Sequence, residues 1–526
     1  MKRLTIILTI LTLSLWLGVS CTEDAPISRP PQTEDSGNKD DEDDKKEPET
    51  PEEPEEPENP EEPETPEEPE NPETPDDPTN TDYPDTSWAA GELDWVFDME
   101  ALPEIRVEVP LAQWNALLAE YDRDSNTNAY VHCDVEFKSK GETHTFADAG
   151  LRLRGNTSRR RPEGNGGEMH RKDDTDWRHC HFMLNLHKYQ KDDAHELHNM
   201  RKLHLKWFKD DRAYCRELYC YDLFRRFGIW TGVYSSYCRL WIHVEGDTKP
   251  AYYGVYELIE PIDDHYVKKR KELFGDHKHN LWKCRWGATL NYNDIYNSWM
   301  GYDDDSNNAY TYELKSNTEN YNAAREQLIE FTRNVTQRTG QDFHDWIASV
   351  CDVRLLLRTY AVNVAVGMWD DYWNNSNNFY IYFNTSDKNN YQFFFIPFDY
   401  DNTLGTSNNC GVQGDSGTHS PLNWGDTGRC PLIGKILQYD DYRAIYIEAL
   451  HELCAEENDL FYYQASIERI NKWHNLIRNY VVNDTDEDCE IKDRPAGWGN
   501  NYSYRLLDNS SSVNFFRVKA ASIPSK

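Results

Sequence analysis

The sequence of 526 residues lacks three features, and each absence excludes a class of protein. No two cysteines are spaced as Cys-x-x-Cys, so a zinc ribbon is excluded. After residue 20, no stretch approaches the roughly 18 apolar residues that a membrane-spanning helix needs. No basic stripe stands out against a net charge of −37, so no nucleic-acid partner is expected.

The first 20 residues, MKRLTIILTILTLSLWLGVS, place two basic residues before a short apolar run, which is typical of a secretion signal. The run ends in small residues directly before Cys21. This pattern resembles a bacterial lipoprotein signal and predicts lipidation of Cys21; the alternative is ordinary secretory cleavage nearby. We therefore expect an exported protein that is anchored to a membrane only through this lipid, at the outer membrane or the cell surface.

Residues 21–87 form a low-complexity segment with repeats such as PEEPEEPENPEEPETPEEPENPETPDDP. Residues 22–86 hold 27 acidic residues, four basic residues and 15 of the 25 prolines. Because such a composition repels itself and cannot bury a core, it predicts an extended, disordered stalk. A globular body at 88–500 and a tail at 501–526 are expected to follow.

The body divides into a strand-rich part and a mainly helical part. Alternating apolar residues predict strands at 104–110, 129–155, 181–189, 200–208, 235–246 and 251–260. Helical spacing predicts helices at 111–121, 213–228, 320–340, 352–369 and 442–457, with a hairpin of strands at 378–384 and the start of 393–405. This order predicts an α+β fold of two lobes, the N-terminal one strand-rich and the C-terminal one mainly helical.

The stretch FFFIPFDYDNTLG, residues 393–405, leads from an apolar strand into Asp399 and Asp401. Two carboxylates at a strand exit are costly to bury unless they are paired or hold a cation. One interpretation is the Asp-x-Asp-x-Thr motif of the haloacid dehalogenase phosphatases, whose first Asp attacks phosphate. No βαβ alternation follows, and Lys435 stands only five residues before Asp440, so this interpretation is disfavoured.

The preceding stretch MWDDYWNNSNNFYIYFN, residues 368–384, offers a second interpretation. Asp370 and Asp371 precede Asn377 and Asn378, which stand just before a strand. In a kinase active site, one Asp accepts the proton of the attacking hydroxyl, while an Asn and a later Asp hold Mg²⁺ on the phosphates. The alternative is that these polar residues only cap turns.

Four blocks, in order over most of 100–410, resemble the CotH kinase family, the spore coat protein H-like secreted kinases. They are LRLRGNTSR at 151–159, LHLKWFKDDRAYCRELYCYDLFRRFG at 203–228, YYGVYELIEPIDDHYVKKR at 252–270, and an ending that combines DDYWNNSNN with FDYDNTLG at 370–405. The resemblance implies an atypical kinase fold. It also implies that the protein uses ATP with Mg²⁺ or Mn²⁺.

The resemblance implies roles for single residues as well. The catalytic residue would be Asp371, with Asp370 beside it. The metal ligands would be Asn377 or Asn378 together with Asp399, supported by Asp401.

The residues implied at the nucleotide are Arg152, Arg154, Gly155, Asn156, Arg178, Glu217, Glu260 and Lys283. Arg178 stands where the family usually has lysines. The residues themselves leave alternatives open: the loop around Gly155 suits a basic surface hairpin, Glu217 a solvated helix surface, and Glu260 the end of a hairpin.

Two function classes therefore remain. The first is an exported, metal-dependent phosphotransferase that acts on a protein or another hydroxyl-bearing acceptor. The second is a surface-displayed binding or adhesion protein on a kinase-like scaffold without catalysis. The cluster of Asp371, Asn378, Asp399 and Asp401 favours the first class, because a binding protein does not need it.

Overall fold

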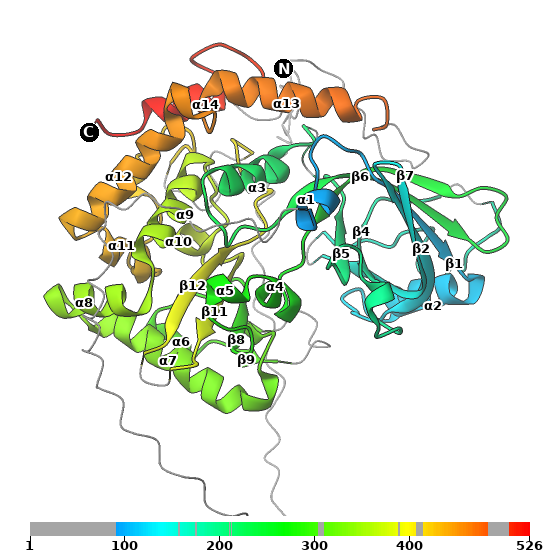
Figure 1. Ribbon diagram of the computed structural model, residues 1–526, viewed down its shortest axis with the longest axis horizontal. Coiled ribbons are helices and arrows are strands. Elements are labelled where there is room, and N and C mark those ends of the chain that lie inside the picture. The colour runs from blue at the N-terminus through cyan, green and yellow to red at the C-terminus, as the bar shows by residue number, and fades with distance from the viewer. Residues whose placement is uncertain are drawn as a thin grey trace, which may run out of the picture. The chain divides into compact units, whose positions relative to one another are not determined.

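The computed structural model describes residues 91–155, 158–173, 176–209, 211, 213–302, 310–387, 390–406, 414–481 and 504–525 (Figure 1). Chain contacts divide the protein into Met1–Asn80 and Thr81–Lys526, and every described residue belongs to the second unit. The predicted signal segment, the stalk, Cys21 and Asn156 lie outside the described residues. Within the described ranges, no helix has the length and apolar character needed to cross a membrane.

Seven strands close into a barrel in the order β1-β2-β3-β4-β5-β7-β6. Every neighbouring pair is antiparallel except β1 and β6, which run parallel. Alternation sets the facing of the side chains: Val135 and Phe137 in β2 are buried in the barrel core, whereas His132 and Asp134 are exposed. The strands are β1 (Glu104–Val109), β2 (Val131–Ser139), β3 (Glu142–Arg154), β4 (His181–Asn185), β5 (Lys202–Lys206), β6 (Ser235–Val244) and β7 (Ala251–Ile259).

The predicted strands of this region are confirmed, and so is the predicted helix at 111–121, which is α2 (Leu111–Arg123). The closure of the sheet is a new finding. It depends on the parallel pairing of β1 with β6, which places Glu104 opposite Arg239. Helices α1 (Leu93–Val96) and α2 add apolar side chains to the barrel core.

Helix α3, Arg216–Arg226, connects β5 to β6 but belongs to a different hydrophobic core. Its side chains Leu218 and Leu223 pack in the second core, which also contains residues of α9 (Val353–Ala365) and β12 (Gln392–Pro397). The helix contacts both β6 and α9 (Figure 1). It therefore joins the barrel to the remainder of the chain.

The second core is built around a sheet in the order β12-β11-β8-β10-β9. The sequence predicts only the hairpin of β11 (Phe379–Asn384) and β12. The other strands are β8 (Asn280–Cys284), β9 (Met300–Gly301) and β10 (Tyr312–Leu314), of which β9 and β10 are too short for a readable alternation. The α+β class is confirmed, but the second part contains a full sheet and not just an inserted hairpin.

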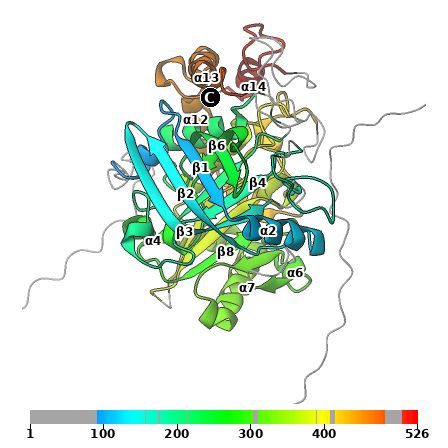
Figure 2. The same cartoon turned by 90° about the vertical axis from the view of Figure 1, so that its right-hand side faces the viewer.

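Helices surround this sheet. Figures 1 and 2 both show α7 at one end of the region and α13 with α14 at the other. The predicted helices at 320–340, 352–369 and 442–457 are confirmed as α7, α9 and α12. The helices not yet given are α4 (Asp264–Lys269), α5 (Lys271–Phe274), α6 (Tyr292–Ile295), α7 (Tyr321–Gln337), α8 (Gly340–Val350), α10 (Tyr372–Asn375), α11 (Pro431–Ile436), α12 (Asp440–Cys454), α13 (Tyr463–Ile477) and α14 (Phe515–Ala521).

A buried ion pair fixes the point where the chain leaves the barrel. Glu260 follows β7 and accepts two hydrogen bonds from Arg270, at 2.8 and 2.7 Å, and both side chains are fully buried. Lys269 Nζ adds a contact of 2.9 Å to the same carboxylate. These contacts give Glu260 a structural part, and its predicted place at the nucleotide remains a prediction.

Substitution of Glu260 tests how much this ion pair stabilises the point where the chain leaves the barrel. We expect Glu260→Gln to lower the free energy of unfolding by about 3–5 kcal/mol, because it leaves Arg270 buried without its counter-charge. Urea unfolding at pH 7 measures the difference. The exposed Glu272 serves as the control, since Glu272→Gln removes only a surface contact to Lys271 and is expected to change stability by less than about 0.5 kcal/mol.

The pairing of Glu260 with Arg270 and Lys269 also predicts that the folded protein loses stability in acid. Burial alone would raise the pKa of Glu260, but the charges of Arg270 and Lys269 outweigh it and lower the pKa to about 2. The ionised pair therefore stabilises the fold fully above the ordinary value of 4.5, and this contribution is lost as the pH falls toward 2. Unfolding of the Glu260→Gln protein should lack this part of the pH dependence; identical curves for the two proteins would contradict the assignment.

Candidate functional site

At the end of strand β5, the ammonium group of Lys206 contacts three carboxylates. Lys206 Nζ lies 2.5 Å from Glu217 Oε2 on α3. It also lies 2.6 Å from Asp399 Oδ1 and 3.0 Å from Asp401 Oδ2, both beyond the end of β12. Burial lowers the pKa of Lys206, but these carboxylates outweigh burial and raise the pKa well above its usual range. The side chain therefore remains charged at neutral pH.

Helix α3 holds Glu217 through a second residue one turn later, Tyr221. The Tyr221 hydroxyl donates to Glu217 Oε1 at 2.8 Å and accepts from the backbone N–H of Asp399 at 3.0 Å. Both oxygens of Glu217 are thus engaged, and the side chain is 2% exposed. Glu217 therefore positions Lys206, and its predicted place at the nucleotide remains a prediction.

Asp399 and Asp401 keep one oxygen each for another ligand. Their side chains are 31% and 33% exposed, and each uses a single oxygen on Lys206. Within the described ranges, Asp399 Oδ2 and Asp401 Oδ1 accept no hydrogen bond. Asp399 adopts a left-handed conformation with φ of +62°, which is uncommon for a residue other than glycine and is found at functional sites.

The two acids have different affinities for protons. Burial raises the pKa of Asp399, but Lys206 and Arg154 outweigh it and lower the pKa. At Asp401, burial and the charges of Asp399 and Glu217 outweigh Lys206 and raise the pKa to about 7. The cluster therefore holds more negative charge than Lys206 balances, and a further cation would stabilise it.

Two more cations act on this cluster, Arg154 at the end of β3 and Lys283 in β8. Lys283 Nζ lies over the rings of Phe398 and Tyr380, at 5.4 and 5.9 Å from their centres. Neither cation makes a hydrogen bond or an ion pair within the described part of the chain. Burial lowers the pKa of Arg154, and burial together with the charge of Arg285 lowers the pKa of Lys283 well below its ordinary value, so a neighbouring anion would favour the charged form of both groups. An anion such as a phosphate group would give both side chains a partner.

Asp371 orders the loop that precedes α10. It accepts from the backbone N–H of Asn374 at 2.9 Å, as the cap of the helix, and from Asn363 Nδ2 at 2.7 Å. Asn363 Oδ1 in turn accepts from the hydroxyl of Tyr400, the residue between the two acids. At 3% exposure, Asp371 connects this loop to the exit of β12 and offers little surface to a substrate.

Asp370 is the more accessible member of the pair. Its Oδ1 accepts from Asn375 at 2.6 Å and Asn377 at 3.1 Å, and its Oδ2 accepts from Asn378 at 3.0 Å. Burial raises the pKa of Asp370 to about 6, and the negative charge of Asp399 adds to this effect. The amide oxygens of Asn377 and Asn378 make no hydrogen bond within the described ranges, so they remain available.

The other predicted nucleotide residues lie on the barrel. Gly155 follows Arg154 with φ of +107°, and a Cβ at this position would come within 2.8 Å of Ser158 Oγ, so glycine is required there. Arg152 donates to Asn128 Oδ1 at 2.8 Å, and Arg178 lies 3.2 Å from the carboxylate of Asp176. These contacts do not connect Arg152 or Arg178 to the cluster at Lys206. Their part in nucleotide binding remains a prediction.

Lys206 and Tyr221 are the site residues that sequence reasoning missed. Lys206 ends a strand, KLHLK, in which the last four residues are all buried. A lysine in so apolar a strand requires a buried counter-charge, and a helix with Glu217 follows directly. Tyr221 stands four residues after Glu217, on the same face of the helix. These two signals together could have identified the pair.

A strand lysine paired with a helix glutamate, beside an Asp that follows a later strand, is the arrangement of a kinase active site. The family model described as CotH kinase protein matches residues 151–506. The chain therefore belongs to the CotH kinase family, and this membership implies an ATP-using activity. None of the curated proteins compared with it matches the sequence.

Removal of the ammonium group tests the charge balance of the site. We expect Lys206→Met to lower the free energy of unfolding by roughly 3 kcal/mol in a buffer free of divalent cations, because three carboxylates lose their shared partner. Thermal or urea unfolding measures the loss. Added Mg²⁺ is expected to restore part of the stability and to affect the parent protein less.

The matched control is Lys138→Met, which breaks a surface pair with Glu136 in the barrel. Its effect should stay within about 0.5 kcal/mol, with or without Mg²⁺. Equal stability of Lys206→Met and the parent in the absence of metal would contradict the charge-balance argument.

Proposed function

We propose that this protein is an exported, metal- and ATP-dependent phosphotransferase that acts on a protein or another hydroxyl-bearing acceptor. The contact of 2.5 Å between Lys206 and Glu217, next to Asp399, carries the proposal. In kinases, a lysine held in this way binds the nucleotide phosphates, and an Asp after a later strand binds their metal ion. Membership in the CotH kinase family supports the same activity.

The donor atoms suit Mg²⁺ or Mn²⁺, because both ions prefer carboxylate and amide oxygens. Asp399 Oδ2 and Asp401 Oδ1 would hold the ion, and the amide oxygen of Asn378 or Asn377 is a further candidate. When bound, such an ion neutralises charge on the phosphates and holds them in place. Glu217, Asp399 and Asp401 lie close enough together to share an ion, but both oxygens of Glu217 accept hydrogen bonds from Lys206 and Tyr221, so we assign Glu217 to positioning Lys206.

The remaining cations would hold the phosphates. Lys206 stays oriented by Glu217, and Arg154 and Lys283 have no competing ion pair within the described chain. Gly155 follows Arg154 directly and has no side chain of its own, so its backbone is a candidate to contact the phosphates beside Arg154. We assign the nucleotide phosphates to the space among these three side chains.

Asp370 is the group that we assign as general base. Three asparagine amides orient its carboxylate, and the charge of Asp399 acts on it. The carboxylate would accept the proton of the acceptor hydroxyl as phosphate is transferred. Asp371, ranked first from the sequence, is better suited to positioning, because it caps α10 and is buried.

We further propose that the barrel with α3 acts as the N-terminal lobe of a kinase-like arrangement, and the helix-bearing sheet as the C-terminal lobe. The barrel side supplies Arg154, Lys206 and Glu217, which would hold and orient phosphate. The other side supplies Asp370 and Asp399, which would carry the base and the metal ion. Phosphate transfer would then occur where the two sets of residues meet.

The metal assignment predicts the behaviour of one isosteric variant. Asp399→Asn is expected to abolish Mg²⁺-dependent ATP binding, because the amide removes the charge that binds the ion. Isothermal titration of the full chain with ATP, with and without Mg²⁺ or Mn²⁺, measures this. The control Asp342→Asn, on α8, breaks an exposed pair with Arg338, the residue after α7, and should bind ATP like the parent. Unchanged ATP and metal binding by Asp399→Asn would show that the metal site is elsewhere.

The assignment of Asp370 as general base predicts that its substitution affects phosphate transfer but not ATP binding. Asp370→Asn is expected to keep ATP affinity but to lower phosphate transfer by roughly 10²- to 10⁴-fold, the usual contribution of a general base. Transfer of labelled γ-phosphate to an acceptor protein, or to the chain itself, is the measurement. A parent protein that neither binds ATP with metal nor transfers phosphate would support the alternative of a non-catalytic surface binding protein.

We propose that the protein is held at the outer membrane or the cell surface by a lipid on Cys21. The apolar segment that ends directly before this residue supports the proposal. Because acyl chains would supply the membrane affinity, Cys21→Ala is expected to move the protein from the membrane fraction to the soluble fraction. Fractionation with immunodetection checks this, and unchanged partitioning would place the anchor elsewhere.

A further inference from the structure

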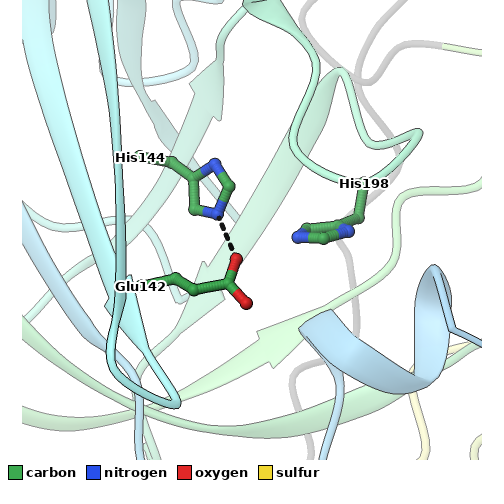
Figure 3. Close-up of side chains that lie close together, drawn as sticks. All are labelled: Glu142, His144 and His198. Atoms are coloured by element: carbon green, nitrogen blue, oxygen red, sulfur yellow. Dashed lines mark hydrogen bonds and ion pairs between the residues drawn. The ribbon is translucent and has the colours of Figure 1, made fainter.

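A second group of metal-ligating side chains lies on the barrel, outside the site at Lys206. Glu142 and His144 stand at the start of strand β3, and His198 comes from the connection between β4 and β5 (Figure 3). One ligand atom from each residue lies within 4.8 Å of the others. His144 Nε2 and Glu142 Oε2 are already 3.3 Å apart. The three side chains thus converge from two separate segments of the chain.

The position of His198 is fixed by its surroundings. Its ring stacks on Trp95, with 4.1 Å between the ring centres, and meets the ring of His144 edge-on at 5.3 Å. Figure 3 shows one nitrogen of the ring directed toward Glu142 and His144. The Nε2 atom of His198 is buried and has no hydrogen-bond partner in the structure. A buried nitrogen without a partner is costly, and a metal ion would satisfy it.

The donor atoms determine which ion fits. Two imidazole nitrogens and one carboxylate oxygen suit Zn²⁺, which takes three such protein ligands and leaves a fourth position for water. The cluster at Asp399 offers only oxygen and suits Mg²⁺ or Mn²⁺ instead. We propose that Glu142, His144 and His198 form a Zn²⁺ site on the barrel, distinct from the phosphotransfer site.

The charges near this site also favour a cation. Lys140 is the positive group beside the cluster, and its ammonium pairs with Asp98 at 2.7 Å. Glu92 adds negative charge close to His198.

A metal ion here would fasten two segments that lead to the proposed phosphate site. Strand β3 runs from Glu142 to Arg154, and β5, which ends at Lys206, begins four residues after His198. The ion would tie the turn between β2 and β3 to the turn that precedes β5. The site would thus hold the far ends of the two strands whose other ends carry Arg154 and Lys206. Its existence does not depend on whether phosphate is transferred.

Titration of the metal-free full chain with Zn²⁺ alone tests the proposal. The variants are His144→Gln, His198→Asn and Glu142→Gln. Asn is chosen at 198 because the backbone there has φ of +44°, a conformation that Asn tolerates. Glu142 is more than half exposed, so Glu142→Gln is expected to fold even if a histidine variant does not. Circular dichroism confirms folding of each protein before the titration.

We expect the parent chain to bind one Zn²⁺ that is lost or weakened by more than roughly 10-fold in each of the three variants, since each loses a direct ligand. The controls are His132→Ala, which removes an exposed His–Asp pair of the same barrel, and Asp399→Asn. Both should bind Zn²⁺ like the parent. Equal Zn²⁺ affinity of the parent and the three variants would overturn the proposal. So would loss of the ion in Asp399→Asn alone, which would place zinc at the acidic cluster.

Discussion

The charge balance around Lys206 is the constraint on which the arrangement of the site depends. One buried ammonium group, that of Lys206, contacts charged carboxylates from α3 and from the segment after β12. Each of these charges alone would be costly to bury, so the elements that carry them must meet. The position of α3 in the second hydrophobic core, in contact with β6 of the barrel, follows from this requirement as well as from its apolar residues.

The residues around Lys206 fall into two groups. One group positions other side chains, and the other remains accessible to a ligand. Both oxygens of Glu217 accept hydrogen bonds, from Lys206 and Tyr221, and Asp371 accepts hydrogen bonds from the start of α10 and from Asn363. Asp370, Asp399 and Asp401 keep partial exposure or unengaged oxygens. This division is what a phosphotransfer site needs, because rigid groups hold the reactive ones at fixed places.

The sequence alone predicts the barrel strands, two parts of the candidate site and the family. Period-two alternation predicts the barrel strands, and an apolar strand that runs into Asp399 and Asp401 marks the acidic cluster. The dense polar run at 370–378 marks the second half of the site. The resemblance to the CotH kinase family, carried by four ordered blocks, is confirmed by the family match.

Other features depend on contacts between distant parts of the chain. Barrel closure needs the parallel pairing of β1 with β6, and no local pattern encodes that partner. Lys206 and Asp399 are 193 residues apart, so the sequence gives each charge without its partner. Glu260 is a further example, because its place at a strand end does not reveal that Arg270, ten residues later, donates to both of its oxygens.

The most direct test of the central claim is a crystal structure of the full chain with Mn²⁺ and a non-hydrolysable ATP analogue, in which anomalous scattering locates the metal. We expect a manganese peak at roughly 2.0–2.6 Å from oxygens of Asp399 and Asp401, with Lys206 still bound to Glu217 and facing a phosphate. A nucleotide bound elsewhere, or a manganese ion without contact to Asp399, would contradict it.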